Sequence, residues 1–135
     1  MKHQIATDPS QSKRMLACGV DPTTADMSHE PYGMPQELTL AVGSPFFVGA
    51  IPAWSLSALL ALLPSEIKED NGYFNEISSY GLLIYPYMQG WQIDYQYCED
   101  DECHCLKCIH DFDLIGACVK AIEWLTANGY PLNTK

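Results

Sequence analysis

Cysteine and histidine residues are concentrated in one short stretch of this 135-residue chain. Residues 98–110 hold four of the six cysteines and two of the four histidines. Thiolate and imidazole groups are the preferred ligands of tetrahedral zinc. The candidate ligands are Cys98, Cys103, Cys105 and Cys108, with His104 and His110 as substitutes. One hypothesis is therefore a small module stabilised by zinc.

The spacing of these residues fits a zinc site less well than their chemistry does. Cys105 and Cys108 have the Cys-x-x-Cys spacing of a zinc knuckle, but a strong site combines two such pairs separated by a folded loop. Here every candidate falls within residues 98–110, so a single ion would have to take all of its ligands from this one short segment. A redox role is a weaker alternative, because this Cys-x-x-Cys does not open a helix in a βαβ unit. We therefore expect a surface loop with reduced thiols and no cofactor, with zinc as the alternative.

Acidic residues crowd the same part of the chain. Residues 94–113 hold seven aspartates and glutamates and one lysine, which accounts for most of the formal net charge of −10. Glu99, Asp100, Asp101 and Glu102 are consecutive. A dense negative patch is typical of a docking surface for a basic protein partner, which it attracts over long range. The simplest alternative is an acidic loop that is merely solvated.

No motif with a catalytic mechanism is present in the sequence. It has no glycine-rich phosphate loop, no nucleophile elbow and no His-Glu-x-x-His. A Cys105–His110 dyad can be drawn on paper, but proximity in sequence does not supply the pocket that such a dyad requires. We therefore expect a protein that is not an enzyme.

The overall charge balance excludes two classes of binding partner. With 17 acidic and 7 basic residues, the chain lacks the basic footprint of a nucleic-acid binder or of a protein that docks on anionic lipid. The uncharged stretch 38–65 is interrupted by glycine and proline, so we expect no membrane span. No apolar segment follows Lys2, so we expect no secretory signal and a cytoplasmic protein. In that reducing compartment, cysteines are expected to be free, metal-bound or redox-active.

Three helices are expected, over residues 9–18, 55–63 and 113–128. Asp8 is a predicted N-cap with Gln11 as its capping-box partner, and Ser55 and Asp113 are predicted caps of the other two helices. Apolar residues recur at helical spacing in the second and third segments, which predicts that both helices are buried.

A β-hairpin is expected over residues 81–97, with a turn at Tyr87–Gly90 in which Gly90 can adopt positive φ. Apolar and polar residues alternate along its second strand. Trp91 and Tyr95 are expected in the core, although a small-ligand site would use the same aromatic residues. A short strand is predicted near 38–42, and residues 65–79 are expected to form a polar loop.

These elements predict a single α+β domain over 1–135, with helices packed on one face of a small antiparallel sheet that contains the hairpin and the 38–42 strand. Residues 36–135 are expected to form the core, and the helix and loop region 1–35 to pack less tightly.

Three segments of the chain resemble small uncharacterised proteins encoded by phages and integrated mobile elements of gut bacteria. The segments are Gln11–Met27 (QSKRML, GVDP and TADM), Pro52–Leu60 (PAWSLSALL) and Ala117–Lys120 (ACVK). Together with the rest of the C-terminal helix that contains Ala117–Lys120, they cover about a third of the chain in the same order, and the Cys/His-rich stretch is not part of the pattern. The resemblance implies an accessory protein of a mobile element, without assigning a role to any residue.

The leading hypothesis from the sequence is a non-enzymatic, acidic, cytoplasmic accessory protein that binds another protein through Glu99–Glu102. The alternatives are the zinc-stabilised module and the small-ligand-binding domain.

Overall fold

A computed structural model describes residues 4–31, 39–43, 49–70 and 77–133 of the chain. Within these ranges it contains three α-helices, a short 3₁₀ helix η1 (Pro22–Thr24) and seven strands in two antiparallel sheets. The predicted α+β class is therefore confirmed.

The helices begin where the sequence places their caps. They are α1 (Pro9–Ala17), α2 (Leu56–Leu62) and α3 (Leu114–Ala127). Asp8 and Gln11 form a complete capping box at α1, since each side chain accepts the backbone N–H of the other residue. Ser55 and Asp113 are the N-caps of α2 and α3, and the side chain of each accepts one backbone N–H from inside its helix. All three predicted helices are confirmed to within one or two residues.

A three-stranded sheet has the order β2–β1–β3. Its strands are β1 (Met27–Glu30), β2 (Thr39–Val42) and β3 (Ile51–Ala53). The strand expected near 38–42 is thus confirmed as β2, with Leu38 outside the described residues. Its expected place beside the hairpin is wrong, because it pairs with β1, a four-residue segment without a readable alternation of apolar residues.

A four-stranded sheet has the order β4–β5–β6–β7, with each strand antiparallel to the next. Its strands are β4 (Glu66–Asp70), β5 (Ile77–Tyr87), β6 (Gly90–Glu99) and β7 (Glu102–Asp111). The hairpin predicted over 81–97 is confirmed and is longer at both ends. The loops predicted over 65–79 and 98–110 are wrong where the structure describes them, because they contain β4 and β7. Both are edge strands of this sheet, and their many exposed polar side chains resemble those of a loop.

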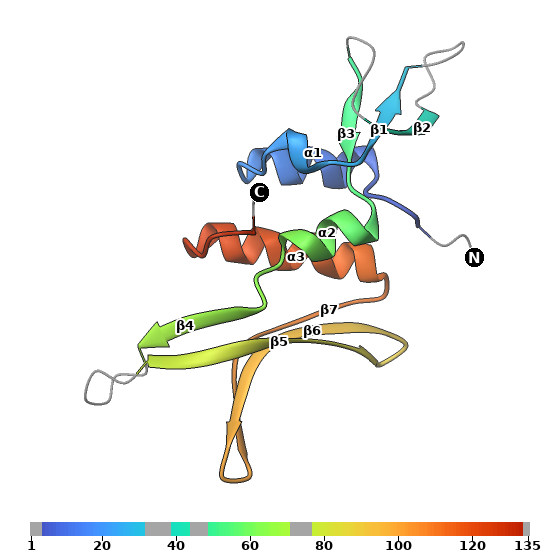
Figure 1. The fold of residues 1–135 in the computed structure, drawn as a ribbon. Helices are drawn as coiled ribbons and strands as arrows, with labels where there is room; N and C mark the ends of the chain where they lie inside the picture. The colour runs from blue at the N-terminus through green and yellow to red at the C-terminus, as the bar shows by residue number, and fades with distance from the viewer. Residues whose placement is uncertain (1–3, 32–38, 44–48, 71–76, 134–135) are drawn as a thin grey trace.

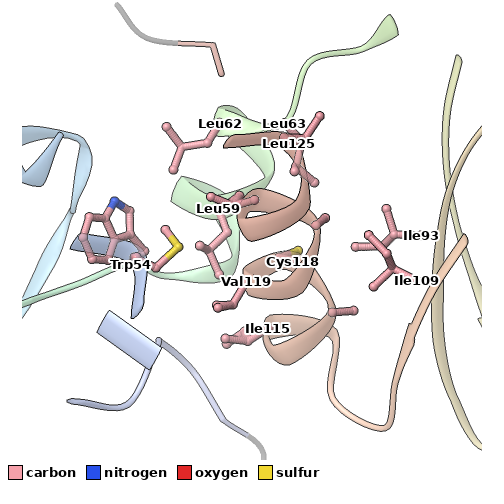
Figure 2. Packing of buried hydrophobic residues seen from close by; sticks show 14 of the residues in the cluster. Trp54, Leu59, Leu62, Leu63, Ile93, Ile109, Ile115, Cys118, Val119 and Leu125 are labelled. Atoms are coloured by element: carbon pink, nitrogen blue, oxygen red, sulfur yellow. The ribbon is translucent and has the colours of Figure 1, made fainter. Parts of the chain in front are cut away.

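The helices form a layer between the two sheets (Figure 1). Helix α3 lies directly on the four-stranded sheet, and α1 and α2 pack against its opposite side. Figure 2 shows Trp54 and Leu59 on one side of α3 and Ile93 and Ile109 on the other. Met15 of α1 is also completely buried in this core. Among the described residues, no helix is both long and apolar enough to cross a membrane.

All three helices lie on one side of the four-stranded sheet (Figure 1). Ile93 and Tyr95 of β6 face α3 and are completely buried, so the alternating residues Gln92 and Asp94 belong to the opposite face. We call this opposite side the outer face. The distal part of the β6–β7 hairpin bends out of the sheet on the outer side (Figure 1).

The turn between β5 and β6 differs from its prediction in one respect. Met88 and Gln89 adopt positive φ (51° and 59°), whereas Gly90 does not. Gly90 instead lies against the next strand, where an added Cβ would approach the carbonyl oxygen of Asp111 to 2.5 Å and the Cα of Phe112 to 2.8 Å. The glycine is required by this close backbone approach, because the turn itself uses the two preceding residues.

Replacing Gly90 by alanine should therefore lower the free energy of unfolding, by about 1–3 kcal/mol, because the new methyl group must displace backbone. Gln89→Gly should raise the stability by up to about 1 kcal/mol, since glycine adopts positive φ without a steric penalty. Urea denaturation of the two variants measures both effects. Equal stability of Gly90→Ala and the wild type would contradict the packing argument.

Candidate functional site

The β6–β7 turn presents four consecutive carboxylates. Asp100 and Asp101 occupy the two central positions with φ of 50° and 67°, and Glu99 and Glu102 form the last pair of the ladder. Aspartate tolerates this left-handed conformation better than most residues. All four side chains are exposed, and within the described part of the chain the one basic group near them is the imidazole of His104, whose Nε2 lies 3.8 Å from the Glu102 carboxylate.

Two other acidic residues of the 94–113 region, Asp111 and Asp113, serve the fold. Asp113 caps α3, and Asp111 accepts hydrogen bonds from the Asp113 N–H at 2.9 Å and pairs with Lys120 at 2.9 Å. Burial raises the pKa of Asp111, but the Asp113 N–H and the Lys120 ammonium outweigh it and hold that pKa below its ordinary value. The structure thus separates the structural carboxylates from those at the turn, which point into solvent.

The four clustered cysteines are divided into two pairs. Cys98 and Cys103 face each other across the ladder and form one disulfide, and Cys105 and Cys108 form another. The structure therefore differs from the expectation of unpaired thiols. It also does not bring the predicted ligands Cys98, Cys103, Cys105 and Cys108 into one set, because the two pairs occupy different places along the hairpin.

One group in the described residues brings together three side chains that could hold a metal ion, and one of them, Asp94, is not among the ligands that the sequence predicts. The carboxylate of Asp94 and the sulfurs of Cys105 and Cys108 all lie within 4.8 Å of one another. The predicted substitutes His104 and His110 are not part of this group. His104 stacks on Tyr97, and the Nε2 atom of His110 lies 3.0 Å from the carbonyl oxygen of Tyr87.

Asp94 is held firmly although it lies on the outer face. Its side chain is only 3 % exposed, and its two oxygens accept hydrogen bonds from the Tyr85 hydroxyl at 2.5 Å and from Gln92 Nε2 at 3.0 Å. The hydrogen bond to Asp94 raises the pKa of Tyr85 to about 12, because it stabilises the protonated phenol.

An aromatic row continues along this outer face towards the β5–β6 turn. Tyr85, Tyr87, His110 and Phe112 make successive edge-to-face contacts, with ring centroids 5.4–6.3 Å apart. Tyr87 and Phe112 are largely exposed, at 53 % and 77 %. This row is an apolar surface that the described chain leaves in contact with solvent.

Cys118 and Tyr95 belong to the core. Cys118 is completely buried in α3, and burial raises the pKa of its thiol to about 12. Tyr95 is also in the core, where its hydroxyl donates to the carbonyl oxygen of Pro64 at 2.8 Å, and Trp91 is half-buried. A shallow groove of about 360 Å³ between β7 and α3, lined by Lys107, Lys120 and Trp124 among others, includes neither Tyr95 nor Trp91.

Comparison of the chain with protein-family models, with curated proteins and with solved structures found no match. The candidate site therefore rests on its own geometry.

Sequence reasoning found the acidic turn and the cysteines but missed Asp94 as a member of the group. Its place within an alternating strand, between two core residues, was a usable signal that it faces the other side of the sheet. The sequence predicts a loop where the partner strand β7 lies, so its pattern gives no indication that Cys108 is directly opposite Asp94.

Protein purified without reductant should contain Cys98–Cys103 and Cys105–Cys108 disulfides, with Cys18 and Cys118 free. Peptide mapping by mass spectrometry without reduction identifies the linked peptides. In the reduced, folded protein an alkylating reagent should modify the four exposed hairpin cysteines much faster than Cys118, whose burial keeps it inaccessible and protonated. Linkage between Cys98 and Cys108, or rapid modification of Cys118, would contradict the arrangement described above.

Proposed function

We propose that this protein is a non-enzymatic interaction module that binds a basic segment of another protein through the acidic turn of the β6–β7 hairpin. One observation carries the proposal: Glu99, Asp100, Asp101 and Glu102 are all exposed at the end of a hairpin that projects from the body of the protein (Figure 1). Nearby carboxylates with structural roles are held by hydrogen bonds and an ion pair, whereas these four are available to a partner.

The projecting geometry favours electrostatic recognition. A turn of four carboxylates surrounded by solvent can approach a cationic surface from several directions, and like-signed charges concentrated in one place steer an oppositely charged partner during encounter. Such an interaction should weaken as the salt concentration rises, because exposed charges are screened over about 10 Å at 0.1 M salt.

The aromatic row supplies a second contact on the same side of the sheet. The exposed rings of Tyr87 and Phe112 can pack against the aliphatic stems of lysine and arginine and attract their charged groups. The turn and the row lie at opposite ends of the ten-residue strand β6, about 30 Å apart when measured along the strand at the usual rise per residue. A basic segment lying along the outer face would contact both.

The proposal includes an accessory role in a phage or mobile element, which the resemblance of three sequence segments supports. It includes no catalytic step, because the sequence offers no motif with a mechanism and the imidazole of His110 is directed to the Tyr87 carbonyl oxygen, not to Cys105.

The test is binding of extended lysine- and arginine-rich peptides, measured by fluorescence anisotropy at low and high salt. The quadruple variant Glu99→Gln, Asp100→Asn, Asp101→Gly, Glu102→Gln removes the four charges and keeps the turn, since Asn-Gly is the preferred sequence for two residues with positive φ. We expect this variant to lose at least tenfold in affinity, about 1.4 kcal/mol, and most of the salt dependence.

A matched control separates the turn from the net charge of the whole protein. It introduces four lysines at exposed helical positions, so that the net charge changes by the same amount far from the hairpin. The substitutions are Ser10→Lys, Ala17→Lys, Ala61→Lys and Ala127→Lys. The control should bind the peptides nearly as well as the wild type. Equal loss in both variants, or no loss in the turn variant, would overturn the proposal.

A further inference from the structure

A buried carboxylate and two sulfurs meet beside the β-bulge of the β6–β7 hairpin. We infer that Asp94, Cys105 and Cys108 form a binding site for one thiophilic divalent cation, of which Zn²⁺ is the representative, when the Cys105–Cys108 disulfide is reduced. This inference is independent of the proposed function, because it concerns the middle of the hairpin and not its acidic turn.

The backbone builds this group of ligands through a β-bulge. Tyr95 lies opposite Lys107 and Gln96 opposite Cys105, so Leu106 has no partner in the ladder. In a regular strand, residues three positions apart point to opposite faces. The extra residue corrects this offset and places Cys105 on the same face as Cys108. Asp94 is the direct ladder partner of Cys108, so all three ligands converge on the outer face.

The chemistry of the group suits a tetrahedral ion. Zinc binds thiolate at about 2.3 Å and carboxylate at about 2.0–2.2 Å, which puts neighbouring ligand atoms roughly 3.5–4 Å apart. The 4.8 Å limit within which all three ligand atoms lie is compatible with that separation, once the two sulfurs are no longer bonded to each other. Three protein ligands leave the fourth position for water or for a donor from another molecule.

The surroundings of the ligands fit a metal site. Tyr85 and Gln92 hydrogen-bond the two oxygens of Asp94 and fix its orientation, which is how residues around metal ligands usually act. Cys105 and Cys108 are exposed, which gives the ion a path from solvent to the buried carboxylate.

The Cys105–Cys108 disulfide and a bound metal ion exclude each other, because both use the same two sulfurs. A dithiol reductant transfers two electrons and two protons to the Cys105–Cys108 disulfide, giving two thiols, and is itself oxidised to a disulfide. The cation then displaces both thiol protons and binds the resulting thiolates together with the Asp94 carboxylate. A small-molecule disulfide reverses the step: it accepts the two electrons, leaves as two thiolates and re-forms the Cys105–Cys108 disulfide, so that only one carboxylate remains and the ion is released.

The experiment is titration of the reduced full-length protein with Co²⁺, a spectroscopic substitute for Zn²⁺. We expect one equivalent of Co²⁺ per chain, with thiolate-to-cobalt charge-transfer bands and the visible bands of tetrahedral coordination, all removed by Zn²⁺. Protein in which the disulfides have been re-formed should show none of these bands. Absence of the bands in the reduced wild type would overturn the inference.

Three variants test which residues bind. Asp94→Asn and Cys108→Ser should each weaken Co²⁺ binding at least tenfold, and Cys108→Ser leaves the hydrogen bonds of Asp94 in place, so it tests the site even if Asp94→Asn perturbs the fold. The matched control Cys98→Ser/Cys103→Ser removes the other cysteine pair and should bind one equivalent as the wild type does. Loss of binding in this control, or unchanged binding in Asp94→Asn and Cys108→Ser, would overturn the assignment.

Discussion

Helix α3 packs on both of its sides, and the arrangement of the other layers depends on that packing. One side covers Ile93 and Ile109 of the four-stranded sheet, and the other meets Leu59 of α2 and the N-terminal helix. Each large apolar side chain buried here contributes about 1.5–3 kcal/mol. Gly116 allows α3 to lie very close to Asp111 at the end of β7, since a Cβ at position 116 would lie 2.8 Å from the Asp111 carboxylate. The helix therefore fixes the end of β7 as well as the core.

This packing determines which surfaces remain for function. Because every described helix lies on one side of the four-stranded sheet, the outer face and the distal β6–β7 hairpin are not needed to bury the core. Exposed aromatic rings, carboxylates and cysteines are found there, where the fold places few demands on side-chain type. Asp94 is the exception, because it is almost completely buried on the outer face and is satisfied by its own strand and its neighbour.

The hairpin has two separable parts with different chemistry. Its tip carries four solvated carboxylates, which act at long range and are sensitive to salt. Its middle carries a carboxylate and two sulfurs whose geometry is set by a bulge, and these act only on a bound ion or on each other. A metal ion or a disulfide at Cys105 and Cys108 joins two residues of β7 on either side of the bulge residue Leu106.

The sequence by itself determined the three helices and the central hairpin, because caps such as Asp8 with Gln11 and the alternation along β6 are local signals. It also located the acidic turn and the cysteine-rich segment, since both are consecutive residues. Tertiary structure alone decided that residues 102–111 form a strand, because a bulge interrupts their alternation and an edge strand can keep polar residues exposed. It also decided that Asp94 joins Cys105 and Cys108. That meeting depends on the register between two strands, which is set by backbone pairing across the sheet and leaves no mark in the spacing of the residues.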